Sequence, residues 1–155
     1  MNYVGTLFHV GVRVADLEAA MADLGGGLGI TWASVVEGDQ PVWTPADGAF
    51  ATPVRFTYSC EGPQHVELVQ GEPGSPWDGT DVPGLHHHGV WVDDVAAETE
   101  RLVAAGWTVE MAQAPPEEGY GAITYVRSPS GFRLEPVTSA LQPLFERWWA
   151  GGPFA

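Results

Sequence analysis

The sequence contains nearly the same segment twice. Residues 7–16 (LFHVGVRVAD) return as residues 85–94 (LHHHGVWVDD), 78 positions later. Each copy alternates as a half-buried strand does and ends in an aspartate, after which a helical pattern begins. A later strand in each half carries a glutamate, Glu67 in HVELV and Glu135 in FRLEPV. A duplication of this kind predicts two similar modules that share one core.

Each half reads as a strand, a helix and three further strands, in the order βαβββ. Asp16 and Asp94 are placed to cap the two helices. In the first half we expect strands over 6–14, 30–36, 54–60 and 64–70, a helix from residue 17 to 28, and a long Pro- and Gly-rich loop over 37–53. In the second half we expect a strand over 85–92, a helix over 94–105, and strands over 107–112, 122–127 and 132–138.

The fold class expected from these elements is α+β, and 155 residues suffice for one domain. We place module 1 at about residues 4–70 and module 2 at about 85–138. The segment 71–84 is rich in Gly and Pro and is expected to link them. A tail helix is expected over 140–150. The sequence leaves open whether the modules pair within one chain or swap between subunits.

One histidine and one glutamate per copy predict a metal site near the axis that relates the two modules. The four candidate ligands are His9, Glu67, His87 and Glu135. Two imidazoles and two carboxylates form a mixed nitrogen and oxygen set that suits Zn, Ni, Co, Mn or Fe(II). We therefore expect one divalent ion per site, with a coordination position left for water or substrate.

Three consecutive histidines, at 86 to 88, leave a choice of ligand in the second copy. Gly11 and Gly89 each follow the repeated histidine position by two residues, and aligning them pairs His9 with His87. Strand alternation then turns His86 and His88 toward the face that the helices cover.

The charge of the chain excludes several functions. It has no lysine, six arginines and 20 carboxylates, for a net charge of −14. Nucleic-acid binding needs clustered basic residues, and an anionic membrane surface is disfavoured for the same reason. The lone Cys60 and the absence of a signal-peptide pattern lead us to expect a cytoplasmic protein. Seven tryptophans favour an apolar or aromatic small-molecule substrate.

The motifs FHVGVRVAD, LHHHGVWVDD and SPSGFRLE, in this order over about residues 6–138, resemble the vicinal oxygen chelate superfamily. This is the group of glyoxalases, bleomycin-resistance proteins and dioxygenases. The resemblance implies two tandem βαβββ modules whose curled mixed sheet encloses a metal-centred cleft. The order of His and Glu is similar to that of glyoxalase I, whereas residues 84–94 look closer to the methylmalonyl-CoA epimerase branch.

This resemblance implies a metal-dependent lyase, isomerase or epimerase. The metal would polarise the carbonyl of a small substrate and stabilise an enediolate. Glu135 or Glu67 would leave the metal to act as the base, and we favour Glu135. The absence of lysine argues against a coenzyme A thioester as substrate. We also expect a homodimer.

Four residues are candidates for binding the substrate. By alternation Arg13 shares a face with His9, Trp91 with His87, and Arg133 with Glu135; Tyr120 lies in a Gly-Tyr-Gly loop that is either a lid or a turn. Trp91 fits the core equally well. The alternatives to a lyase or isomerase are a metal-independent binding protein of the antibiotic-resistance type, an Fe(II) extradiol-type dioxygenase, and a cyclase of secondary metabolism.

Overall fold

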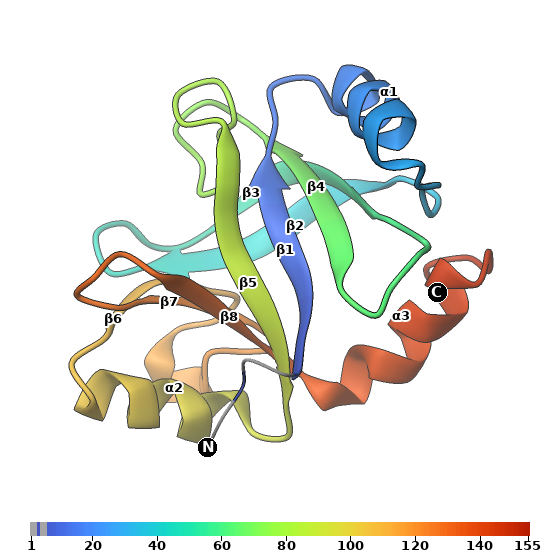
Figure 1. Ribbon diagram of the computed structural model, residues 1–155. Helices are drawn as coiled ribbons and strands as arrows, with labels where there is room; N and C mark the ends of the chain where they lie inside the picture. Colours follow the sequence, from blue (N-terminus) through green and yellow to red (C-terminus); the bar gives the residue numbers. More distant parts are fainter. Residues whose placement is uncertain (1–2, 4–5) are drawn as a thin grey trace.

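The computed structural model describes Tyr3 and residues 6–155 (Figure 1). Module 1 contains β1 (Leu7–Arg13), α1 (Leu17–Leu28), β2 (Val36–Thr44), β3 (Gly48–Tyr58) and β4 (His65–Gly71). Module 2 contains β5 (Gly84–Val92), α2 (Val95–Ala104), β6 (Thr108–Ala112), the 3-10 turn η2 (Pro116–Glu118), β7 (Thr124–Arg127) and β8 (Arg133–Thr138). The chain continues with the 3-10 turn η3 (Ser139–Leu141) and helix α3 (Gln142–Trp149).

The strands of this described part close into one barrel, in the order β1-β4-β3-β2-β6-β7-β8-β5. The order within the first half, β1-β4-β3-β2, matches that within the second, β5-β8-β7-β6. In each half the first strand pairs in parallel with the last, and the other neighbours are antiparallel. Strands β1 and β5 run antiparallel and side by side (Figure 1). The predicted α+β fold of two βαβββ modules around a curled mixed sheet is confirmed, and the modules pair within the chain.

The two helices begin as the repeat predicts. The carboxylate of Asp16 accepts a hydrogen bond from the amide of Ala19 at 2.9 Å, and that of Asp94 accepts one from Ala97 at 2.9 Å. Each bond satisfies an amide that the first turn of a helix leaves free. Among the described residues, no helix is long and apolar enough to cross a membrane.

The predicted loop over 37–53 is wrong, because this segment forms most of a β-hairpin. Strands β2 and β3 pair without a break from Val36 opposite Phe56 to Thr44 opposite Gly48. The prolines that suggested a loop, Pro41 and Pro53, are exposed. Pro41 lies outside the part of β2 that pairs with β6, and Pro53 lies outside the part of β3 that pairs with β4. Proline is tolerated there because no partner needs its missing amide. The strand expected over 30–36 is reduced to a single bridge and the start of β2.

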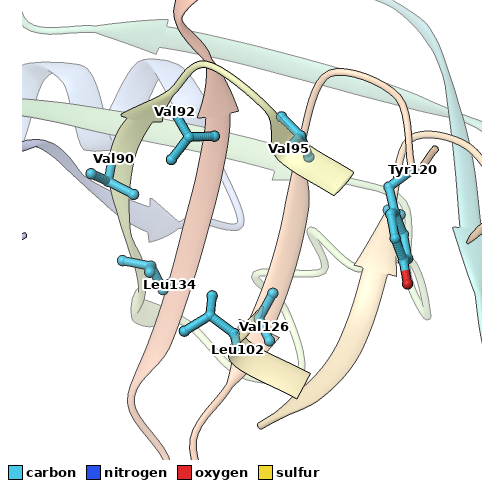
Figure 2. Packing of buried hydrophobic residues seen from close by; sticks show 8 residues of the cluster. Val90, Val92, Val95, Leu102, Tyr120, Val126 and Leu134 are labelled. Atoms are coloured by element: carbon cyan, nitrogen blue, oxygen red, sulfur yellow. The ribbon is translucent and has the colours of Figure 1, made fainter. Parts of the chain in front are cut away.

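Among the described residues, the apolar core forms three clusters. One cluster fills the space between α2 and the outer face of β5, β7 and β8; it includes Val90, Leu102, Val126 and Leu134 (Figure 2). A second surrounds α3, whose Trp148 is fully buried. The third lies inside the barrel. The barrel interior therefore contains both apolar side chains and a group of polar side chains, which is described in the next section.

Candidate metal centre

His9 and His87 converge because each lies over a glycine of the other repeat. In the β1–β5 pair His9 lies opposite Gly89, and Gly11 lies opposite His87. A Cβ added at Gly89 would be 2.0 Å from Cε1 of His9, and one added at Gly11 would be 2.1 Å from Cε1 of His87. No other amino acid fits under either ring. The repeated glycines thus make room for the histidine of the opposite copy.

The two glutamates complete the symmetry on the outer sides of this strand pair. Glu67 on β4 lies opposite Gly11, and Glu135 on β8 lies opposite Gly89. Each glycine therefore has an imidazole on one side and a carboxylate on the other. All four side chains are buried and point to one place in the barrel.

The donor atoms of this group lie at distances that suit a bound cation. The two Nε2 atoms are 3.0 Å apart. Glu67 Oε2 lies 3.0 Å from Nε2 of His87 and 3.3 Å from Nε2 of His9, and Glu135 Oε1 lies 3.8 Å and 3.3 Å from the same two atoms. Ligands at about 2.0–2.1 Å from a tetrahedral metal are about 3.3 Å apart. The four predicted residues are thus brought together as a group that could hold a divalent ion.

The carboxylates change the protonation of this group. Burial opposes a charge on His9, but the carboxylates of Glu135 and Glu67 outweigh it and raise the pKa of His9 to about 9. The pKa of Glu67 is lowered, because hydrogen bonds to His87 and His9 outweigh its burial. In the metal-free protein these side chains therefore hold a proton that a bound cation would displace.

A cavity of about 240 Å³ opens onto both carboxylates. Its other walls are mainly apolar and aromatic, and they come from both modules and from the C-terminal segment. Its lining includes Val54, Phe56, Tyr58, Val69, Trp77, Ile123, Tyr125, Val137, Leu141, Phe145 and Phe154. We call this cavity the central pocket.

Two tyrosines in the central pocket were missed in the sequence. Tyr58 lies directly opposite Glu67 in the β3–β4 pair. Its hydroxyl is 3.4 Å from Nε2 of His9. Tyr125 packs against His87, and its hydroxyl accepts a 2.8 Å hydrogen bond from Nε1 of Trp77. Tyr58 could have been predicted from the register of the β3–β4 hairpin, which places it opposite Glu67.

Both tyrosines remain hydrogen-bond donors over the physiological range of pH. Burial and the nearby carboxylates, Glu67 and Glu135, raise the pKa of Tyr58 and of Tyr125 well above 10. The central pocket therefore offers two neutral hydroxyl groups beside two carboxylates.

His86 does not follow the predicted alternation. The pairing of β1 with β5 passes from Gly11 opposite His87 to Val12 opposite Leu85, so His86 has no partner on β1. This β-bulge puts the His86 ring beside that of His87 instead of on the helix-covered face. Burial is the main cause that lowers the pKa of His86 to about 2, and the nearby Arg133 and Arg13 lower it further. His88 keeps the outward direction and stacks on Phe132.

The two arginines lie in a second cavity of about 460 Å³, which shares Tyr125 with the central pocket. Nη1 of Arg13 donates to the carbonyl of Pro76 at 3.2 Å. Arg133 forms an ion pair with Glu110. Neither of these two predicted substrate-binding arginines lines the central pocket.

Trp91 and Tyr120 are placed away from both cavities. Trp91 stacks on Phe8 with ring centres 3.9 Å apart and meets Phe145 edge-on. Tyr120 is buried in the cluster beneath α2 (Figure 2). The structure therefore packs Tyr120 among apolar residues and Trp91 against Phe8 and Phe145, and the Gly-Tyr-Gly segment is a turn after η2 rather than an open lid.

Comparisons with known proteins agree with this fold. A family model described as the Glyoxalase/Bleomycin resistance protein/Dioxygenase superfamily matches residues 8–125. Similar structures include a hypothetical protein from Bacillus halodurans C-125, with a TM-score of 0.59 and 18% identity over 86% of this chain and 93% of its own. Methylmalonyl-CoA epimerase from Mycobacterium tuberculosis has a TM-score of 0.58 and 20% identity over 89% and 90%.

A variant of 4-hydroxymandelate synthase from Streptomyces coelicolor has a TM-score of 0.57 and 15% identity, over 86% of this chain and 47% of its own. At such identities the likeness shows the fold alone. No curated protein matches the sequence significantly.

Proposed function

The chain belongs to the Glyoxalase/Bleomycin resistance protein/Dioxygenase superfamily, and we propose that it is a divalent-metal-dependent lyase or isomerase. Its substrate is a small carbonyl compound with an apolar or aromatic group, and its reaction passes through an enediolate. The observation that carries this proposal is the buried group of His9, Glu67, His87 and Glu135, with both carboxylates facing the central pocket. A binding protein without chemistry has no need for two buried carboxylates at that place.

The four residues would hold one divalent ion. When bound, such an ion supplies a Lewis acid for two neighbouring oxygens of the substrate and makes the adjacent C–H group more acidic. The residues of the chain then need to orient the substrate, take the proton and return it.

Glu135 is the better candidate for the base. Its Oε1 lies 3.3 and 3.8 Å from the two imidazole nitrogens, whereas Oε2 of Glu67 lies 3.3 and 3.0 Å from them. Glu135 is thus held less closely and is freer to turn toward the pocket. Its carboxylate takes the proton from the carbon beside the carbonyl. Return of the proton to another position or face gives isomerisation or epimerisation, and loss of a leaving group gives a lyase.

The walls of the central pocket support an apolar or aromatic substrate. Phe56, Phe145 and Phe154 offer ring surfaces, and the hydroxyl of Tyr58 lies 3.4 Å from Nε2 of His9. We expect that hydroxyl to donate a hydrogen bond to the oxygen that gains charge as the proton leaves.

The test uses 2-hydroxyacetophenone, which combines an aromatic ring, two neighbouring oxygens and an exchangeable C–H group. Its exchange in deuterated water is followed by proton NMR with protein loaded with Co²⁺ or Zn²⁺. The proposal predicts metal-dependent exchange that is lost in Glu135→Gln and kept in Glu117→Gln, a control at an exposed carboxylate. Exchange that persists in Glu135→Gln overturns the choice of base.

The apolar walls of the pocket also favour a second candidate, a protein that sequesters an apolar metabolite or drug. In that case ligand affinity would be the same in His9→Ala and His87→Ala as in the natural chain, and no exchange would be seen. An Fe(II)-dependent uptake of oxygen would instead indicate a dioxygenase.

A further inference from the structure

The run of three histidines holds a second buried imidazole beside the candidate ligand His87. His86 is 8% exposed, although it stands at a bulge in β5. Its Nδ1 atom lies 2.9 Å from Nδ1 of His87. Two nitrogens at this distance form a hydrogen bond only if one carries the proton and the other accepts it.

The direction of this bond follows from the place of His87. Nε2 of His87 points into the four-residue group and contacts Glu67 at 3.0 Å. If Nε2 gives its lone pair to a cation, the proton of the neutral ring is on Nδ1. That proton then points at Nδ1 of His86, which accepts it, and His86 carries its own proton on Nε2.

Neighbouring groups hold His86 in this position. Nη1 of Arg133 donates to the carbonyl of His86 at 2.9 Å, and Arg133 is itself tied to Glu110. The ring of Tyr125 packs edge-on against the ring of His86 at 5.0 Å. The bulge and its hydrogen-bond acceptor are therefore fixed by three side chains.

The first repeat provides an internal comparison. The residue equivalent to His86 is Phe8, which also stands at an irregularity in the pairing of β1 with β5. Its ring packs edge-on against His9 at 4.4 Å and offers no acceptor. Accordingly, Nδ1 of His9 is buried without a hydrogen-bond partner in the part of the chain that the structure describes. Only one of the two candidate histidine ligands has a supporting imidazole.

We propose that His86 is a positioning residue, whose Nδ1 accepts the Nδ1 proton of His87 and so turns Nε2 of His87 toward the bound cation. This inference rests on the proposed function, because it takes the four-residue group to bind a divalent ion. It assigns a role to a histidine that the ligand set does not use.

The test compares two substitutions that separate hydrogen bonding from packing. His86→Phe copies the first repeat: it keeps a ring of similar shape but removes the acceptor. His86→Asn is smaller but places an oxygen acceptor near the position of Nδ1. His88→Phe is the matched control in the same run, since the His88 ring points outward and stacks on Phe132.

Co²⁺ affinity is measured by competition with a chelator, together with the visible spectrum of the bound Co²⁺ and the far-UV circular dichroism of the metal-free chain. Loss of a partner to a ligand histidine typically weakens metal binding about 10- to 100-fold. We expect this loss in His86→Phe, a smaller loss in His86→Asn, and a change of less than about twofold in His88→Phe. A role in packing alone predicts the opposite order, with His86→Phe binding more tightly than His86→Asn.

The inference is overturned if the natural chain binds Co²⁺ and His86→Phe binds it equally tightly with the same spectrum. It is also overturned if His86→Phe binds Co²⁺ more tightly than His86→Asn does. If the natural chain binds no Co²⁺, the proposed function fails first, and the two failures are thus distinguished. Circular dichroism identifies a variant that does not fold. If His86→Phe does not fold, the inference is tested by the Co²⁺ affinity of His86→Asn relative to that of the natural chain.

Discussion

Gly89 lies directly beneath the imidazole of His9, so close that a Cβ on it would be 2.0 Å from Cε1 of that ring. Gly11 has the same relation to His87, at 2.1 Å. The duplicated sequence thus encodes a histidine and, two residues later, the space for the histidine of the other copy. This reciprocal contact brings the two imidazoles to 3.0 Å.

Gly89→Ala is expected to displace His9 and to strain the β1–β5 pair. Overpacking of a closely packed site typically lowers the free energy of unfolding by about 1–3 kcal/mol. We expect a loss of this size in urea unfolding, together with weaker Co²⁺ binding. Gly38→Ala is the control, because a Cβ on this strand glycine meets no atom within 4 Å. Equal stability and Co²⁺ affinity in the two variants would contradict this account of the glycines.

The metal-free protein is expected to become less stable as the pH rises from 7 to 9.5. The pKa of His9 is raised from 6.5 to about 9, so its protonated form stabilises the fold. That stabilisation is fully present below pH 6.5 and is lost as the pH passes 9; it is on the order of 3 kcal/mol. Urea unfolding at the two pH values measures it, and His9→Asn should flatten the difference. A natural chain equally stable at both values would exclude a raised pKa.

Tyr58→Phe is expected to slow the exchange reaction without removing the metal. The substitution deletes only a hydroxyl, which lies 3.4 Å from Nε2 of His9 and faces the central pocket. We expect the rate of exchange of 2-hydroxyacetophenone to fall about 100- to 1000-fold, as for other donors to a developing oxyanion. Metal content should be unchanged. Val54→Ala serves as the control for a change at an apolar side chain of the pocket wall, and an unaltered rate in Tyr58→Phe would remove Tyr58 from the reaction.

Trp148→Ala is expected to destabilise the whole barrel. Trp148 is fully buried, and its Nε1 donates to the carbonyl and the hydroxyl of Ser34, each at 3.0 Å. Loss of a buried tryptophan typically costs about 3–5 kcal/mol. Thermal and urea unfolding measure it against Leu28→Ala, at a residue that is 59% exposed. A loss below about 1 kcal/mol would mean that α3 is not part of the core.

The repeat carried most of the prediction. It gave the order of elements in both halves, both helix caps and the four residues that meet in the barrel, because equivalent elements in two copies imply equivalent positions. It failed where one residue departs from regular pairing. The bulge at His86 leaves no mark in the alternation of LHHHG, so its ring was assigned to the wrong face.

Other errors have similar local causes. Residues 37–53 looked like a loop because Pro41 and Pro53 are poor strand residues, and only the sheet shows that both lie where no amide is needed. For Trp91 the sequence left the choice between substrate and core open, and the structure packs it against Phe8 and against Phe145 of α3. The predicted homodimer and cytoplasmic location stay predictions.

The central claim is that His9, Glu67, His87 and Glu135 hold one divalent ion. Its most direct test is equilibrium dialysis of the purified chain against Co²⁺ and Zn²⁺, with metal counted per chain. We expect one tightly bound ion in the natural chain, and none that withstands dialysis in His9→Ala/His87→Ala. A natural chain that retains no ion, or a double variant that retains it as tightly, would contradict the claim.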